Sequence, residues 1–162
     1  LYPRVIDTEH KLQVSLEDFV LHGVVDVLAQ TAGEAKNGRE IWDYKGSQRV
    51  ASDSAEMENY EFQMQVYAEL YRQKNGQFPQ RAVLCFLGEK ELEDMLVEVP
   101  FGKRSISRAM NVFQGTVAEI ERRRTLDDWS PPSQIPSRET CGACDIRWDC
   151  PTAGHMFPMR HP

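Results

Sequence analysis

The sequence lacks the features that mark membrane, secreted or strongly basic proteins. No stretch approaches the run of about 20 apolar residues that a membrane-spanning helix needs, and no signal-peptide pattern opens the chain. Basic residues are not in excess. The formal net charge is −6, which argues against a simple module that binds phosphate backbones through its charge. The same charge leaves room for a site where carboxylates hold metal ions, because a bound cation reverses the local field.

Cysteine is scarce and unevenly placed. Cys85 stands alone in an apolar run, and the other three cysteines lie in the last quarter of the chain. This placement indicates a metal site in a reducing, cytoplasmic compartment and argues against a secreted disulfide framework. The chain has 162 residues, of which 41% are hydrophobic and 27% charged, and this is enough for one domain with a core and a small appendage.

Residue patterns predict an α/β fold, in which helices flank a mixed central sheet and a small C-terminal appendage carries the cysteines. Runs rich in β-branched and apolar residues predict five strands, at residues 5–14, 19–29, 40–46, 82–87 and 95–101. Apolar residues at helical spacing predict two helices, the first of them ended by Asn75-Gly76, at residues 58–73 and 105–124. We expect the first three strands to form a meander of hairpins.

Polar and turn-forming residues separate these elements. Residues 30–40 form a predicted turn and residues 47–57 a predicted loop. We divide the chain into a core over residues 1–128 and an appendage over residues 129–162. The appendage begins with a Pro-rich linker at residues 129–140, and its cysteine-bearing tail is expected to pack on the core.

Two aspartates and a lysine form the first candidate site. Asp26 interrupts an apolar strand, where a carboxylate is costly unless it is paired, exposed at a strand end or bound to metal. Asp43 and Lys45 are two residues apart on the next strand, so their side chains share a face. Such a group suits phosphodiester chemistry with Mg²⁺ or Mn²⁺. A strand-end salt bridge between Lys45 and one aspartate is the other interpretation of these three residues.

A pair on the following helix strengthens the first interpretation. Gln63 and Tyr67 are four residues apart and share a helical face, although Tyr67 and Tyr71 also fit a core role. In their order and spacing, these motifs resemble the RecB-like nucleases of the PD-(D/E)xK superfamily, over roughly residues 5–150. The segments that carry the resemblance are Gly23-Val-Val-Asp26, Trp42-Asp-Tyr-Lys45 and Gln63-Met-Gln-Val-Tyr67-Ala68.

The resemblance implies a role for each matching residue. Asp26 and Asp43 would bind the catalytic Mg²⁺ or Mn²⁺, and the carbonyl of Tyr44 would complete part of its shell. Lys45 would be the catalytic lysine. The pair Gln63 and Tyr67 would position DNA or support the metal site. The core would have the restriction-endonuclease-like fold of the superfamily.

The family usually carries a further acidic or histidine ligand on a helix before the first strand, and this chain starts at that strand. Glu9 and His10 are the nearest candidates. His22 shares a strand with Asp26 at an even offset, but it also fits a surface position. We therefore expect the chain to be the C-terminal part of a longer protein.

The cysteines form a second motif, Cys141-x-x-Cys144 followed by Cys150-Pro151. A Cys-x-x-Cys turn brings two thiolates close enough for one metal, and Cys150 can fold back as a third ligand. The spacing resembles the iron–sulfur motif of AddB-type and CRISPR-adaptation nucleases, which implies a 4Fe-4S cluster whose first cysteine lies upstream. Zinc is the alternative, with His155 as its fourth ligand. Cys85 is a weaker candidate because its segment is a predicted core strand.

The resemblance implies a divalent-metal-dependent DNA nuclease, an exonuclease acting on ends or single strands in repair, recombination or defence. It also implies a fused or associated helicase and no membrane partner. One alternative is a nuclease-like module that has lost catalysis and holds DNA or a helicase. A small zinc-binding interaction protein is the other alternative, and it leaves the Asp-Lys-Gln-Tyr series unexplained.

Overall fold

The computed structural model describes residues 4–16, 19–32, 38–129, 137–152 and 154–157. The chain divides into two compact units, Leu1–Gly115 and Thr116–Pro162, and each is described by itself. The centre of the turn predicted after the second strand and the proline-rich part of the predicted linker lie outside the described residues. No helix in the described part has both the length and the apolar character needed to cross a bilayer.

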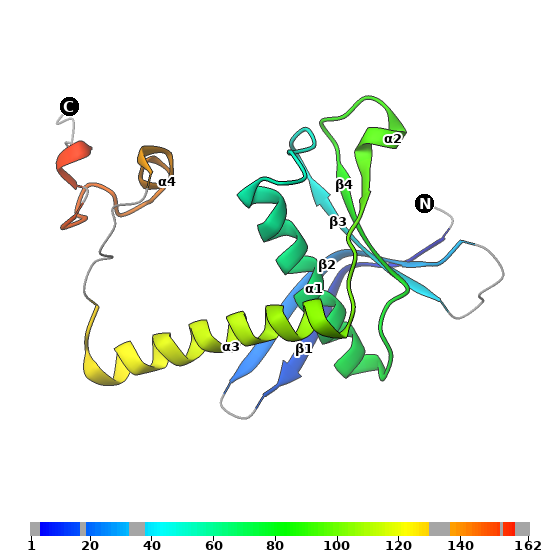
Figure 1. Ribbon diagram of the computed structural model, residues 1–162, viewed down its shortest axis with the longest axis horizontal. Helices are drawn as coiled ribbons and strands as arrows, with labels where there is room; N and C mark the ends of the chain where they lie inside the picture. The colour runs from blue at the N-terminus through cyan, green and yellow to red at the C-terminus, as the bar shows by residue number, and fades with distance from the viewer. Residues whose placement is uncertain (1–3, 17–18, 33–37, 130–136, 153, 158–162) are drawn as a thin grey trace. The chain divides into compact units, whose positions relative to one another are not determined.

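The first unit is built on a five-stranded sheet in the order β1-β2-β3-β4-β5 (Figure 1). Its strands are β1 (Val5–Ser15), β2 (Val20–Gln30), β3 (Arg39–Lys45), β4 (Arg81–Phe86) and β5 (Leu96–Glu98). The first three strands pair antiparallel as the predicted meander, β4 runs parallel to β3, and β5 returns antiparallel to β4. The predicted mixed sheet is confirmed.

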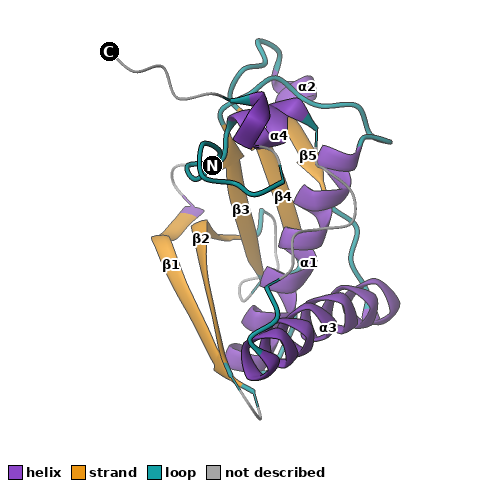
Figure 2. Cartoon of the chain, turned by 90° about the vertical axis from the view of Figure 1, so that its left-hand side faces the viewer, coloured by secondary structure: helices purple, strands orange, loops and turns teal. Residues whose placement is uncertain are grey.

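Helices connect the later strands. The helix α1 (Ala55–Asn75) joins β3 to β4 and provides the crossover that a parallel pair requires. Figure 2 shows it running along one face of the sheet. The short α2 (Leu92–Met95) precedes β5, and α3 (Lys103–Leu126) follows it. In the second unit lie α4 (Arg138–Gly142) and a 3-10 helix, Gly154–Met156.

Apolar side chains are buried on both faces of the sheet. On the α1 face, strand residues such as Ile41 and Phe86 belong to one core cluster with Met64 of α1. Because side chains alternate along β3, Asp43 and Lys45 point to the same face as Ile41. The opposite face carries a smaller cluster of Val27, Ala29, Trp42, Val83 and Cys85.

The helix α1 begins earlier than predicted and ends as predicted. Residues 55–57, predicted as loop, form its first turn. The Ser54 hydroxyl accepts the Met57 N–H at 3.1 Å and so satisfies an amide donor that has no partner within the helix. At the other end, Gly76 adopts a left-handed φ of 79° and donates its N–H to the Arg72 carbonyl at 2.7 Å.

The last strand is shorter than predicted. Of residues 95–101, only Leu96–Glu98 form β5, and the first belongs to α2. The Val99 N–H still donates to the Ala82 carbonyl at 2.8 Å. Pro100 follows, and it has no N–H with which to extend the ladder.

The helix α4 begins inside the predicted linker, residues 129–140, so the last three residues of that segment are helical. Ser137 explains the start of the helix. Its hydroxyl accepts the Thr140 N–H at 3.2 Å, and its carbonyl accepts the Cys141 N–H at 2.9 Å. A single serine cap of this kind is hard to distinguish from ordinary linker composition.

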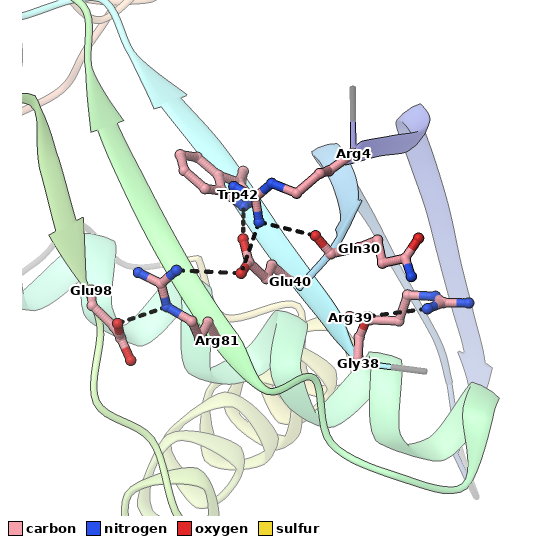
Figure 3. A network of polar contacts seen from close by, with 8 residues as sticks. All are labelled: Arg4, Gln30, Gly38, Arg39, Glu40, Trp42, Arg81 and Glu98. Carbon is pink, nitrogen blue, oxygen red and sulfur yellow. Dashed lines mark hydrogen bonds and ion pairs between the residues drawn. The ribbon is translucent and has the colours of Figure 1, made fainter. Parts of the chain in front are cut away.

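Glu40 is a carboxylate at the centre of a polar network on the opposite face from α1 (Figure 3). Its side chain is 0% exposed, and its Oε1 lies 3.4 Å from Arg4 Nη1 and 3.3 Å from Arg81 Nη1. Trp42 Nε1 donates to its Oε2 at 2.9 Å. Arg81 Nε also donates to Glu98 Oε2 at 2.8 Å. The buried charge is therefore compensated, as burial requires.

Gly23 lies where β2 passes under α1. A Cβ at this position would stand 2.9 Å from Cε1 of Tyr67 and 3.1 Å from Cδ1 of Leu70. We expect Gly23→Ala to lower the free energy of unfolding by about 1–3 kcal/mol, because the added carbon must push the tyrosine ring away from the strand. Urea unfolding of the variant and the parent measures the difference.

Gly115 of α3 supplies the matched control. A Cβ there would meet no atom within 4 Å. Gly115→Ala should leave the free energy of unfolding unchanged or raise it by up to about 1 kcal/mol, because alanine loses less backbone entropy in a helix. Equal destabilisation by both substitutions would contradict the packing explanation for Gly23.

Candidate active site

The structure brings Asp43, Lys45, Gln63 and Tyr67 together on the α1 face of the sheet. Lys45 Nζ lies 2.6 Å from Asp43 Oδ2 and donates to Gln63 Oε1 at 2.9 Å. Gln63 Nε2 in turn donates to the Tyr67 hydroxyl at 3.1 Å. A strand therefore supplies the acid and the ammonium, and one helical face supplies the amide and the phenol that hold the ammonium in place.

Asp26 reaches the same region from β2. Its Oδ2 accepts the Tyr44 N–H at 2.7 Å. Pairing between β2 and β3 ends at Val27 opposite Trp42, one residue before Asp26 and Asp43. The Asp26 carboxylate thus accepts the Tyr44 N–H at a point where β2 and β3 no longer form backbone hydrogen bonds.

Asp26 also stands at a break in the side-chain alternation of β2. Leu21 and Val25 belong to the core cluster on the α1 face, whereas Val27 and Ala29 belong to the cluster on the opposite face. A residue spacing of two should keep all four on one face. The switch occurs at Asp26, so this residue belongs to neither apolar face and its carboxylate is free to turn toward β3.

Glu9 marks the same break in β1. The register pairs Thr8 with Val27 and His10 with Val25, but it skips the pair of Glu9 and Asp26. Glu9 has a φ of 52°, a left-handed conformation that costs a non-glycine residue on the order of 1 kcal/mol or more. The strained backbone of Glu9 in β1 therefore lies directly across from Asp26, where the side chains of β2 switch faces.

Burial governs the charge of Asp43. It raises the pKa of the Asp43 carboxyl above its ordinary value, while the hydrogen bond and positive charge of Lys45 work in the opposite direction. The negative charge of Asp26 adds to the rise. The buried Oδ2 of Asp43 meets the Lys45 ammonium at 2.6 Å, and no other hydrogen-bond donor reaches it among the described interactions. A carboxylate oxygen has two lone pairs, so one pair remains available to another cation when the other faces Lys45.

Oxygen donors of this kind fit Mg²⁺ or Mn²⁺. Asp43 contributes a buried carboxylate. Asp26 contributes a second carboxylate, which accepts a hydrogen bond from the backbone N–H of Tyr44, the residue after Asp43. The fit has a limit, because the described residues include no group of three or more His, Cys, Asp or Glu side chains that could hold a metal. Further ligands could be backbone oxygens, neutral side-chain oxygens or water.

The sequence-based candidates for an additional ligand lie on β1 and β2. Glu9 and His22 are exposed on β1 and β2. His10 Nδ1 lies 2.6 Å from Asp7 Oδ2, and this hydrogen bond lowers the pKa of the Asp7 carboxyl. No contact of these residues with Asp43 is present among the described interactions.

Sequence reasoning gave no role to Tyr60, which the structure places beside Lys45. The ammonium lies 4.2 Å from the centroid of the Tyr60 ring. The spacing in the sequence could have indicated this position, because Tyr60 shares a helical face with Gln63 and Tyr67. What the sequence does not reveal is which aromatic residue on that face the lysine meets.

The cysteines of the second unit lie in and after α4. Cys141 is buried, Cys144 exposed and Cys150 half-buried, and none of the four cysteines, all of them described, forms a disulfide. The Cys144 N–H donates to the Cys141 carbonyl at 3.2 Å, so both stand in one turn. The described residues do not bring these thiols together as a group of three. Cys85 lies in the apolar cluster opposite α1, where burial raises its thiol pKa.

The raised pKa of Asp43 has a consequence for stability. Because the native state holds this proton more tightly than the unfolded chain, the stability that the protonated form provides is lost as pH rises through the folded-state pKa. At neutral pH and without divalent metal, Asp43→Asn should therefore raise the free energy of unfolding. The difference should vanish as pH falls below the ordinary value of 3.8, where the unfolded chain also binds the proton.

Denaturant unfolding of both proteins in chelator, at a series of pH values, measures this difference. Adding Mn²⁺ should favour the parent, because metal binding stabilises the folded state only where the carboxylate is present. A parent more stable than the variant at neutral pH in chelator would contradict the assigned direction.

Comparison with known proteins now gives the class of this chain. Residues 3–151 match the family model of the PD-(D/E)XK nuclease superfamily. The match covers most of the 162 residues, and the chain therefore belongs to that superfamily. Among curated proteins, no sequence matches this one.

Two crystal structures resemble the chain. One, from Eubacterium rectale and named "Putative exonuclease", has a TM-score of 0.55 at 16% identity and aligns with 96% of this chain and 54% of its own. The other, SSO0001, has a TM-score of 0.47 at 14% identity over 91% of this chain and 60% of its own. The first likeness supports the fold. The chain spans little more than half the length of either structure.

Proposed function

We propose that this chain is a divalent-metal-dependent DNA nuclease whose centre is formed by Asp26, Asp43 and Lys45. The observation that carries the proposal is the Lys45 ammonium, which meets a buried carboxylate 2.6 Å away and the Gln63 amide 2.9 Å away. The superfamily of the chain supports nuclease activity. A strand-end salt bridge would need neither the second aspartate nor the amide and phenol behind the lysine.

Each residue has a role in this proposal. Asp26 and Asp43, with the Tyr44 carbonyl, would hold Mg²⁺ or Mn²⁺. The metal supplies charge that polarises a phosphoryl oxygen and lowers the pKa of a bound water. Lys45 orients that water or donates to the oxygen on which negative charge grows. Gln63 directs the lysine, and both Gln63 and Tyr67 can face the bound DNA.

The proposal also covers the DNA substrate and the cellular process in which the nuclease acts. We infer an exonuclease of the RecB-like type that acts on DNA ends or single strands in repair, recombination or defence. The name of the Eubacterium rectale structure supports the exonuclease class. By the same resemblance to RecB-like nucleases, we propose that a helicase is fused to this chain or associates with it.

The cysteines extend it further. We propose that Cys141, Cys144 and Cys150 bind a structural 4Fe-4S cluster of the AddB type, with its fourth ligand upstream, or zinc with His155. The turn that joins Cys141 to Cys144 supports a shared metal. Iron, sulfide and zinc analysis of anaerobically purified protein distinguishes the two metals, and a protein with none of them would contradict both.

One alternative function has an observation in its favour. The described residues contain only two acidic side chains at the candidate centre and no third His, Cys, Asp or Glu for a metal. A nuclease-like module that binds DNA or a helicase partner without cleaving it fits this composition. The alternative predicts DNA binding that chelator does not change.

Cleavage of end-labelled single- and double-stranded DNA by anaerobically purified protein tests the proposed function. We expect cleavage with Mn²⁺, loss of cleavage in chelator, and loss of cleavage in Asp43→Asn. Asp43 is the suitable variant because the substitution keeps the shape of the side chain and removes a proposed metal ligand. Cleavage that survives both treatments would contradict the assigned centre. DNA binding without cleavage would favour the binding module.

A further inference from the structure

We propose that Tyr60 is a positioning residue, whose ring face holds the Lys45 ammonium where it meets Asp43 and Gln63. The proposal rests on the proposed function, because it concerns the residue assigned to catalysis there. It adds a residue that none of the motifs contains. The geometry of the lysine head group and the anchoring of the ring carry it.

Three groups surround the Lys45 head group. The carboxylate of Asp43 lies 2.6 Å from Nζ, the Gln63 amide oxygen accepts from it at 2.9 Å, and the Tyr60 ring centroid lies 4.2 Å away. The lysine side chain is 14% exposed, so little water can replace any of these contacts. An ammonium over an aromatic face is attracted to the ring, and the attraction is strongest where water is excluded.

The ring restricts a side chain that would otherwise be mobile. Lysine carries its charge on a flexible four-carbon stem, and an ammonium alone does not fix its direction. Asp43 attracts the head group toward the strand, and Gln63 attracts it toward α1. The Tyr60 ring face, also on α1, is a third contact, and it limits the rotamers that keep both polar contacts. A lysine that acts on a reacting phosphate needs this precision, because small misplacements cost large factors in rate.

The Tyr60 ring is itself anchored at two points. Its hydroxyl donates to Glu56 Oε1, one turn earlier on α1, at 2.5 Å. This hydrogen bond raises the pKa of the Tyr60 phenol, so the hydroxyl stays protonated and the ring neutral. The ring also lies against Phe86 of β4, with the two centroids 6.1 Å apart. The polar contact and the aromatic contact therefore set the plane that Lys45 meets.

Steady-state cleavage by Tyr60→Leu and Tyr60→Phe tests the proposal. Leucine keeps apolar volume and removes the ring, so kcat should fall roughly ten- to thirtyfold with KM little changed. Phenylalanine keeps the ring face and should restore kcat to within about threefold of the parent. The matched control is Phe78→Leu. It removes a different ring, which lies after α1 with its centroid 5.5 Å from the guanidinium of Arg72, a residue of α1. That control should leave kcat unchanged.

A second measurement is independent of activity. In protein labelled with ¹³C-lysine, the Hε signals of Lys45, assigned with Lys45→Arg, should be shifted upfield by the Tyr60 ring. The shift should persist in Tyr60→Phe and disappear in Tyr60→Leu. Equal Lys45 shifts in the parent and Tyr60→Leu would overturn the proposal even if the parent does not cleave DNA.

The kinetic outcomes also distinguish a positioning role of Tyr60 from a DNA contact and from a general packing effect. A kcat for Tyr60→Leu equal to that of the parent would overturn it. A rise in KM at constant kcat would overturn it too, because it would make Tyr60 a DNA contact. Equal losses of kcat in Tyr60→Leu and Phe78→Leu would overturn it as well, because a general packing defect would then explain both. A parent that does not cleave DNA under any metal condition would reject the proposed function itself, and the lysine signals would still decide the position of the ring.

Discussion

Replacing Lys45 by alanine is expected to lower the rate of DNA cleavage at least about a hundredfold, because a positive charge aimed at the growing negative charge is lost. The ammonium has little freedom, since Asp43, Gln63 and the Tyr60 ring hold it from three sides. The loss should appear in kcat, because the contact strengthens as charge develops and is weaker in the ground state.

Single-turnover cleavage of end-labelled DNA with Mn²⁺ measures this effect. Lys74→Ala is the matched control, because the Lys74 ammonium donates to the Lys11 carbonyl at 2.8 Å and has no proposed part in catalysis. That variant should cleave within about twofold of the parent, since exposed contacts contribute little. Unchanged cleavage by Lys45→Ala would mean that the centre lies elsewhere or that the activity is a contaminant.

The largest effect on stability is expected for Glu40→Ala, with a fall of about 3 kcal/mol in the free energy of unfolding. Glu40 is fully buried, and its loss leaves the indole N–H of Trp42 without its acceptor. The Arg4 and Arg81 guanidinium groups each lose one acceptor and keep another, the Gln30 carbonyl and the Glu98 carboxylate. The Arg4 and Arg81 side chains are 30% and 37% exposed, so water can partly replace the lost carboxylate for them. The buried Trp42 N–H has no such replacement.

Glu98→Ala provides the comparison for Glu40→Ala. Glu98 also pairs with Arg81, at 2.8 Å, but its side chain is 55% exposed. Its removal should cost less than about 1 kcal/mol, because exposed ion pairs are screened by water and salt. Guanidinium unfolding of the two variants measures the contrast, and a cost for Glu98→Ala as large as that for Glu40→Ala would contradict the role of burial.

The sequence determined the elements of the fold and most of their order. The strand-like composition of residues 5–14 and 40–46 and the helical period of residues 58–73 are local features of the sequence, and the structure confirms these elements. The Gly76 cap is local as well. The spacing of Asp43 and Lys45 was enough to place both side chains on one face, because a strand alternates every residue.

Boundaries were the weaker part of these predictions. The serine cap at Ser54 starts α1 about one turn before the apolar period becomes visible, and Ser137 caps the short α4, which has no apolar period at all. Pro100 shortens β5 through a missing donor, although its neighbours have a strand-like composition. Both effects involve single hydrogen bonds, which an average over many residues does not detect.

Only the tertiary structure decided how the candidate centre is assembled. Asp26 lies at a switch in the faces of β2, opposite a strained Glu9, and no local pattern predicts such a switch. The contact between Lys45 and Tyr60 depends on the packing of α1 against β3. Likewise, the burial that raises the pKa of Asp43 comes from elements distant in the sequence. Local patterns reveal which way a side chain points, whereas its neighbours and its access to water depend on how the elements pack.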